Sequence, residues 1–354
     1  MVISLFRSGS KSLLGVDIGT SYIKLLGLSK HAGNIHVECY SVVHLPEGAV
    51  IDNNVQDVPV VAEALELGLR LASTRLKRAV TSVPTSAVIV KQLEFSKTFS
   101  EDELEDQIKV EADQFIPYPL DEVAIDFQIQ GESASSPDLN EIVLVACRQD
   151  SIQSREDAVN GAGMICEVID VDTYAIERLF PVLAEIHDLL DKTLGLVDIG
   201  ANSMTLYVLV EGNVIYSREQ AFGGSDLTHS LTLASDLSAD EIERAKKANE
   251  LSDDLIQEHI NPFKLTTAQQ ISRSIQFYYS SGNHGEIETL LLMGGVAALP
   301  GIDTIVATEL GIKTEVANPF GAMTIDSRIN RHKFDPQAPS LVLACGLALR
   351  SFAE

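Results

Sequence analysis

One short phrase occurs twice in this chain of 354 residues. It reads Leu14-Gly15-Val16-Asp17-Ile18-Gly19-Thr20 in the first half and Leu196-Val197-Asp198-Ile199-Gly200-Ala201 in the second. Each copy closes an apolar run, turns at a glycine and enters a segment of alternating hydrophobicity, at 22–28 and 203–210, as the second strand of a hairpin does. The repeat predicts a duplicated α/β fold.

The composition narrows the class of protein. The length suits two lobes with separate cores. A net charge of -25 disfavours a nucleic acid partner, because such binding depends on clustered Lys and Arg. The cysteines stand singly, without the spacing of a zinc or redox site, and we expect reduced, buried thiols. Since no apolar run reaches the ~18 residues of a membrane span, we expect a cytoplasmic protein without direct membrane insertion.

Strand and helix patterns divide the chain. In the first half they predict a three-strand meander within 13–45, a helix at 58–73 and a strand at 78–83. An acidic helix at 101–115 is marked by a capping box of Ser100 and Glu103, and two strands follow it. This pattern differs from the one that precedes it. In the second half strands are expected at 194–198, 203–210 and 213–221, and a helix at 239–249 that begins with a capping box of Ser238 and Glu241.

These patterns give the following expected organisation. Residues 1–85 begin the first lobe, 86–150 form an inserted subdomain, 151–185 complete the first lobe, 186–330 form the second lobe with a smaller subdomain at about 225–285, and 331–354 form a C-terminal helix that returns to the first lobe.

The repeated turn has a chemistry of its own. A glycine just past a strand lets consecutive N–H groups converge on one anion, and Thr20, Ser21 and Lys24 add donors. Asp17 and Asp198 would repel phosphate, so they make sense facing a divalent cation, Mg²⁺, through its water shell. Asp and Gly are common in ordinary hairpins. Two copies at the same point of two similar lobes, however, predict a grip on a polyphosphate and its metal from opposite sides.

A third glycine segment follows the apolar strand at 290–293. Gly294 and Gly295 form a small-residue turn that precedes a helix, which lets a flat ring and a ribose lie against the backbone. A tight strand-to-helix connection without a ligand is the alternative interpretation.

In this order the three segments resemble the phosphate-one, phosphate-two and adenosine loops of the actin and sugar-kinase ATPase superfamily. The helix at 243–247 resembles the nucleoside-facing helix of DnaK-type chaperones, which implies Glu243 at the ribose and Lys247 beside adenine. Without that resemblance it would be a solvated helix face. The nucleotide-binding residues implied are Gly19, Thr20, Ser21, Lys24, Gly200, Ala201, Asn202, Gly223, Gly224, Glu243, Lys246, Lys247, Gly294, Gly295 and Val296.

The acidic helix followed by Ile116-Pro117-Tyr118-Pro119-Leu120-Asp121-Glu122-Val123, together with Asp198-Ile199-Gly200-Ala201-Asn202, resembles the PilM family. That resemblance implies an α/β, actin-like (ribonuclease H-like, duplicated), two-lobed ATPase fold with an FtsA-type inserted subdomain. It also implies ATP or ADP with Mg²⁺, and a groove near 86–150 that holds the N-terminal cytoplasmic peptide of PilN. The protein would then be a cytoplasmic adaptor of the type IV pilus assembly platform, peripheral to the inner membrane through PilN.

Turnover is a separate question. The resemblance points to Asp172, in the segment 171–176, where relatives carry a polar or acidic side chain that places the attacking water. Because this carboxylate is short, we expect bound nucleotide with slow or absent hydrolysis. An FtsA-like polymerising protein and a small-molecule kinase of the same superfamily remain alternatives. Self-association is left open.

Overall fold

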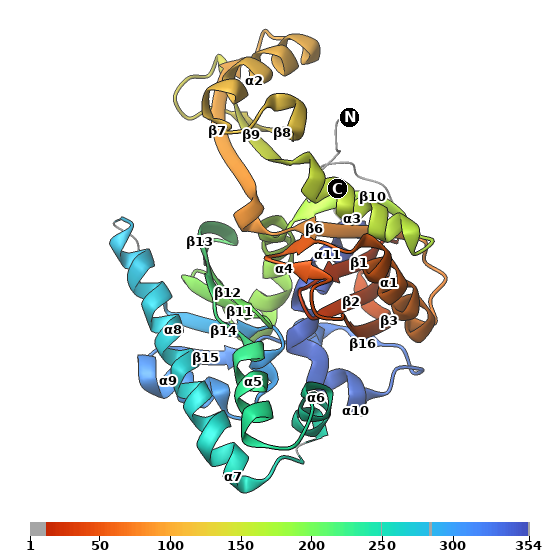
Figure 1. The fold of residues 1–354 in the computed structure, drawn as a ribbon. Coiled ribbons are helices and arrows are strands. Elements are labelled where there is room, and N and C mark those ends of the chain that lie inside the picture. Colours follow the sequence, from red (N-terminus) through yellow and green to blue (C-terminus); the bar gives the residue numbers. More distant parts are fainter. Residues whose placement is uncertain (1–11, 249, 283–284, 353–354) are drawn as a thin grey trace.

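The computed structural model describes residues 12–248, 250–282 and 285–352, and shows two lobes with a smaller unit projecting from the first (Figure 1). Parts of the predicted ranges 1–85 and 331–354 therefore lie outside the described residues, as does residue 249 of the predicted helix. Both sheets of the lobes are mixed, and the class is α/β, as predicted.

The first lobe is built on a six-stranded sheet in the order β10-β6-β1-β2-β3-β16. Its strands are β1 (Leu14–Ile18), β2 (Tyr22–His31), β3 (Asn34–His44), β6 (Arg78–Val83), β10 (Ile165–Val171) and β16 (Thr324–Ile325). The first three are antiparallel, whereas β6 and β10 run parallel to each other. The meander and the strand at 78–83 are thus confirmed.

Helices cover this sheet on both faces (Figure 1). They are α1 (Val58–Ala72), α3 (Gln149–Gly161), α4 (Asp172–His187) and α11 (Val342–Ala348), with the short α10 (Arg331–Phe334) nearby. A small hairpin of β4 (Val50–Ile51) and β5 (Asn54–Val55) precedes α1. The prediction of a helix at 58–73 is confirmed to within one residue.

The second lobe is built on a five-stranded sheet in the order β13-β12-β11-β14-β15. Its strands are β11 (Leu194–Ile199), β12 (Ser203–Val210), β13 (Asn213–Ala221), β14 (Thr289–Met293) and β15 (Lys313–Val316). Its helices are α5 (Gly224–Ala234), α6 (Ala239–Ala248), α7 (Asp253–Leu255), a π-helical turn at Ile256–Ile260, α8 (Asn261–Ser280) and α9 (Ile302–Leu310). Taken in chain order, the strands are arranged 3-2-1-4-5, as are β3-β2-β1-β6-β10 of the first lobe, so the duplication extends to topology.

A separate antiparallel sheet, in the order β7-β9-β8, lies between β6 and α3 in the sequence and projects away from both lobes (Figure 1). It contains β7 (Val88–Ser96), β8 (Val123–Glu132) and β9 (Leu139–Arg148), with α2 (Glu101–Phe115) packed on it. The predicted capping box of α2 is present, since Ser100 and Glu103 exchange hydrogen bonds. We call residues 88–148 the inserted sheet unit.

One hydrophobic core joins the lobes. Leu179 and Leu183 of α4 pack in the same cluster as Leu196 of β11 and Val342 of α11. All seven residues of α11 are buried. The two lobes therefore share one continuous apolar core at their base.

Two further expectations concern cysteines and membranes. Cys39, Cys147 and Cys345 are free and buried, as predicted, whereas Cys166 is free but half-buried. Among the described residues, we find no helix whose length and hydrophobicity would let it span a membrane.

Candidate functional site

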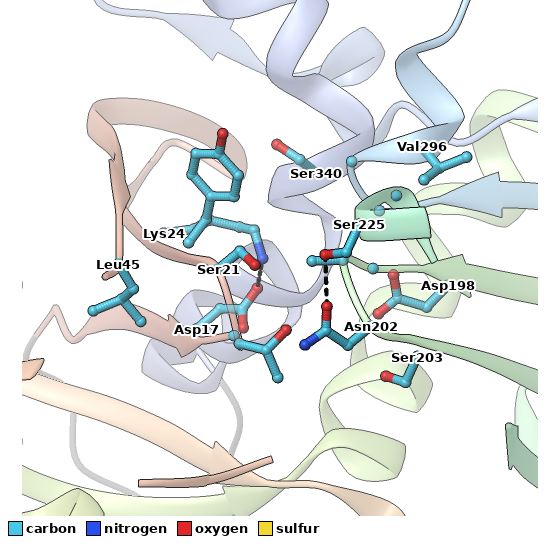
Figure 2. A pocket seen from close by; sticks show the side chains of 18 of the residues that line it. Asp17, Ser21, Lys24, Leu45, Asp198, Asn202, Ser203, Ser225, Val296 and Ser340 are labelled. Carbon is cyan, nitrogen blue, oxygen red and sulfur yellow. Dashed lines mark hydrogen bonds and ion pairs between the residues drawn. The ribbon is translucent and has the colours of Figure 1, made fainter. Parts of the chain in front are cut away.

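A cavity of about 1620 Å³ opens between the two lobes. Figure 2 shows Asp17, Ser21 and Lys24 on one side and Asp198, Asn202 and Ser225 facing them on the other. The predicted residues that line this cavity are Asp17, Gly19, Thr20, Ser21, Lys24, Asp172, Asp198, Gly200, Ala201, Asn202, Gly224, Glu243, Lys246, Gly294, Gly295 and Val296. The side chain of Lys247 lies outside the part that the structure describes.

The two repeated turns have the same hydrogen bonding. The amide of Gly19 donates to the carbonyl of Tyr22 at 3.1 Å, and the amide of Gly200 donates to the carbonyl of Ser203 at 2.9 Å. In both cases a two-strand hairpin folds back immediately after the aspartate. The sequence repeat is therefore a structural repeat at the cleft.

Strand register places Lys24 directly opposite Asp17. The Lys24 ammonium lies 2.8 Å from the Asp17 carboxylate (Figure 2). Burial lowers the pKa of Lys24. Asp17, and more weakly the charges of Asp198 and Asp172, raise this pKa by more than burial lowers it, so the net shift is upward. Lys24 thus stays protonated at the floor of the cleft.

The other two carboxyl groups of the cleft, those of Asp198 and Asp172, have raised pKa values. Burial raises the pKa of Asp198 to about 6, with Lys24 opposing and the charge of Asp17 adding to the rise. Burial also raises the pKa of Asp172 to about 7, although a hydrogen bond from Ser82 opposes it. This cluster carries more negative charge than its cations neutralise, which suits a divalent cation.

The acidic residues do not surround one point closely. Within the described ranges, no group of three or more His, Cys, Asp or Glu side chains is arranged to hold a metal ion directly. Mg²⁺ keeps several of its waters and binds through few carboxylates. The donor set is therefore compatible with a hydrated Mg²⁺, whose waters Asp17 and Asp198 would contact.

Glycines allow three loops to meet around Asp198. Gly294 has φ +86°, and a Cβ built on it would lie 2.4 Å from Asp198 Oδ1 and 2.4 Å from the carbonyl oxygen of Ile199. A Cβ on Gly223 would lie 2.3 Å from the carbonyl oxygen of Ala201. Gly223 is thus a packing residue behind the second turn.

The second turn is braced from α5. The amides of Gly224 and Ser225 donate to the carbonyls of Gly200 and Ala201 at 3.0 and 2.8 Å. The Ser225 hydroxyl donates to Asn202 Oδ1 at 2.6 Å, as Figure 2 shows. These bonds fix the loop without a ligand.

Glu243 projects from α6 into the wall of the cavity. Its Oε1 accepts from the Thr228 hydroxyl at 2.6 Å and from the Lys246 ammonium. Its Oε2 accepts from the Tyr22 hydroxyl of the first lobe at 3.4 Å. The helix therefore contributes to closure of the cleft as well as to its lining.

Several cavity residues were missed by the sequence interpretation. Among them are Asn53, Ser86, Arg155, Tyr207 and Glu219. Asp52 and Asn53 both have positive φ, 47° and 58°, and form a two-residue hairpin turn of type I′. The Asp-Asn pair was the available signal for that turn, but not for its position at the cleft.

Comparison with known proteins places the chain among its relatives. The profile of the family described as type IV pilus assembly protein PilM matches residues 15–352. A solved structure titled "PilM-PilN type IV pilus biogenesis complex" is similar with a TM-score of 0.79 and 26% identity, over 98% of this chain and 100% of that one. Ethanolamine utilization protein EutJ from Carboxydothermus hydrogenoformans has a TM-score of 0.56 and 16% identity, over 98% and 92% of the chains, a likeness of fold alone. The predicted actin-like ATPase fold is confirmed.

Proposed function

The chain belongs to the PilM family of type IV pilus assembly proteins, and from this membership we propose that it binds ATP or ADP with Mg²⁺ between its lobes and captures the N-terminal cytoplasmic tail of PilN. The observation that carries the nucleotide part is the pair of matching turns, at Gly19 and Gly200, that face one cavity from opposite lobes.

The first lobe supplies phosphate donors. The hydroxyls of Thr20 and Ser21 and the ammonium of Lys24 line the cavity beside the Gly19 turn. The Lys24 ammonium is already charged and held by Asp17. A phosphate oxygen bound here would share that ammonium, so Lys24 would link Asp17, the metal waters and the ligand.

The second lobe supplies the other half of the grip. Gly200, Ala201 and Asn202 would contact the phosphates, and Asp198 would orient waters of Mg²⁺. The metal, when bound, supplies positive charge that offsets the carboxylates of Asp198 and Asp172, whose pKa values are raised chiefly by burial and also by the charge of Asp17. This is the reason that we propose metal and nucleotide as a single ligand.

The nucleoside would lie between α6 and the Gly294 turn. Glu243 and Lys246 face the cavity from α6, and Gly294, Gly295 and Val296 face it from the end of β14. Backbone at glycine permits close approach of a flat ring. Glu243 would exchange its contact with the Tyr22 hydroxyl for one with the ribose.

PilN is the proposed partner because the solved relative is titled as a PilM–PilN complex and aligns over its full length. We place the groove beside the inserted sheet unit, which carries exposed apolar side chains at Val90, Phe99, Val110, Tyr118 and Ile129. Through PilN the protein would sit at the inner face of the inner membrane, as part of the assembly platform.

Hydrolysis is proposed to be slow or absent. Asp172 begins α4 at the cavity, and its pKa of about 7 suits a proton acceptor near neutral pH. Its side chain is short, however, and it also interacts with Ser82 and Arg155. We therefore propose that the protein uses nucleotide as a structural ligand.

Calorimetry with the full chain tests the proposal. Titration of Mg-ATP and Mg-ADP should give saturable binding that falls at least about tenfold, or about 1.4 kcal/mol, in Asp198→Asn. Asp236→Asn, an exposed aspartate between α5 and α6, is the matched control and should bind as the unaltered chain does. Equal binding by both variants would contradict the proposed site, and failure of a PilN tail peptide to bind would contradict the partner.

A further inference from the structure

Glu219 of β13 has no part in the proposed grip on the nucleotide, yet it lies in the same row of side chains as Asp198. Strand register pairs Asp198 with Thr205 and Thr205 with Glu219 across β11, β12 and β13. Directly paired residues project from the same face of a sheet. The charge of Glu219 reaches Asp198, whose pKa it helps to raise after burial and Asp17.

The carboxylate of Glu219 crosses the cleft. Its Oε1 accepts from Asn53 Nδ2 at 2.7 Å, and its Oε2 accepts from the Ser86 hydroxyl. Asn53 and Ser86 are both joined to the first lobe, whereas β13 belongs to the second. Glu219 therefore forms hydrogen bonds between the two lobes, and one of them is to Ser86, close in sequence to the inserted sheet unit.

Through these two hydrogen bonds, Glu219 is linked to both chain segments that connect the inserted sheet unit to the first lobe. Ser86 lies two residues before β7, on the outgoing connection. Asn53 reaches the returning connection, because its carbonyl accepts from the buried guanidinium of Arg155 on α3, and Arg155 also donates to the carbonyl of Ser151 at 3.0 Å. α3 follows β9 directly in the chain.

The turn at Asn53 is suited to carry this linkage. It is a tight two-residue turn, so its side chain and its carbonyl are fixed relative to each other. The side chain faces Glu219 while the carbonyl faces Arg155, which is 1% exposed. A displacement of β13 would therefore move both segments that connect the inserted sheet unit to the first lobe.

We propose that Glu219 is a positioning residue that couples the nucleotide cleft to the inserted sheet unit and so sets the affinity for the PilN tail. The inference rests on the proposed function, since it names how that same site is regulated. A ligand that bridges the lobes changes the position of β13 relative to Ser86 and Asn53. The bonds of Glu219 then differ between the liganded and ligand-free states, which is what a coupling free energy requires.

The test measures coupling rather than binding. The affinity of a labelled PilN tail peptide is determined by fluorescence anisotropy with and without saturating Mg-ADP. In the unaltered chain the nucleotide should change that affinity by at least about fivefold. In Glu219→Ala the factor should fall below about twofold, while Glu309→Ala, a matched loss of an exposed glutamate on α9, should keep the full factor.

Two additional variants protect the test against misfolding. Glu219→Gln keeps the shape of the side chain but loses the charge that strengthens both bonds, so it should also lose most of the factor. Asn53→Ala removes one of the two bonds and should lower the factor to an intermediate value. If Glu219→Ala does not fold, the effect of Mg-ADP on the peptide affinity of Glu219→Gln is the deciding measurement.

Each outcome has one meaning. The role of Glu219 would be overturned if Mg-ADP changed the peptide affinity of Glu219→Gln as much as that of the unaltered chain, or if it changed neither. The proposed function would still stand in that case, provided that nucleotide binding, measured separately, was present. Absence of nucleotide binding to the unaltered chain would overturn both.

Discussion

Replacing Asp198 by Asn should make the ligand-free protein more stable while it weakens nucleotide binding. The pKa of Asp198 is raised from its ordinary value of 3.8 to about 6, chiefly by burial. Above pH 3.8 the unfolded chain gives up this proton, whereas the folded chain keeps it until about pH 6. Unfolding therefore releases a proton in this window, and the free energy of unfolding falls as pH rises.

The size of the effect follows from the shift. Each pKa unit corresponds to about 1.4 kcal/mol, so ionised Asp198 costs the folded state about 3 kcal/mol at pH 8. At pH 5 the same arithmetic leaves about 2 kcal/mol, because folded Asp198 is then mostly protonated. Asn cannot ionise, so the variant escapes both costs.

Urea denaturation without nucleotide or Mg²⁺ measures this directly. We expect the free energy of unfolding of Asp198→Asn to exceed that of the unaltered chain, by about 1 kcal/mol more at pH 8 than at pH 5. The pH dependence is the decisive quantity, since differences in hydrogen bonding between Asp and Asn cancel in it. A difference that is the same at both pH values would refute the argument that Asp198 is held ionised at a cost.

Three other predictions address the same cleft. Gly294→Ala should lower the free energy of unfolding by at least about 2 kcal/mol in thermal or urea denaturation, because φ is +86° and the new Cβ would overlap Asp198; a stability equal to that of the unaltered chain would contradict the loop geometry. Lys24→Met should weaken Mg-ATP binding at least about tenfold in calorimetry, because it removes a phosphate donor and leaves Asp17 without its ion pair; unchanged affinity would exclude Lys24 from the site. Turnover in a phosphate-release assay should stay below about 1 per second, and a faster rate would show that Asp172 or another group places the attacking water effectively.

The local parts of the fold could be predicted from the sequence. The turns at Gly19 and Gly200 follow from a glycine between an apolar run and an alternating segment, and this signal lies within a few residues. The same holds for the capping boxes at Ser100 and Ser238, both present in the structure. Duplication made the long-range arrangement predictable as well, since two like lobes bring like turns together.

The contacts across the cleft could not be predicted in this way. Asn53 and Glu219 are 166 positions apart, and neither belongs to a repeated phrase. β16 has two residues and pairs with β3 from the far end of the chain, which is too short a segment to carry a pattern. Lys24 was expected near the site. Its pairing with Asp17, however, depends on the exact register of β1 and β2, which is set by the turn between these strands.

The central claim is that matching turns from two lobes hold one metal-bound nucleotide. A crystal structure of the full chain grown with Mg²⁺ and a non-hydrolysable ATP analogue tests it most directly. We predict phosphates between residues 19–21 and 200–202, with the metal's waters bonded to Asp17 and Asp198. A nucleotide bound elsewhere, or an empty cleft at saturating ligand, would contradict it.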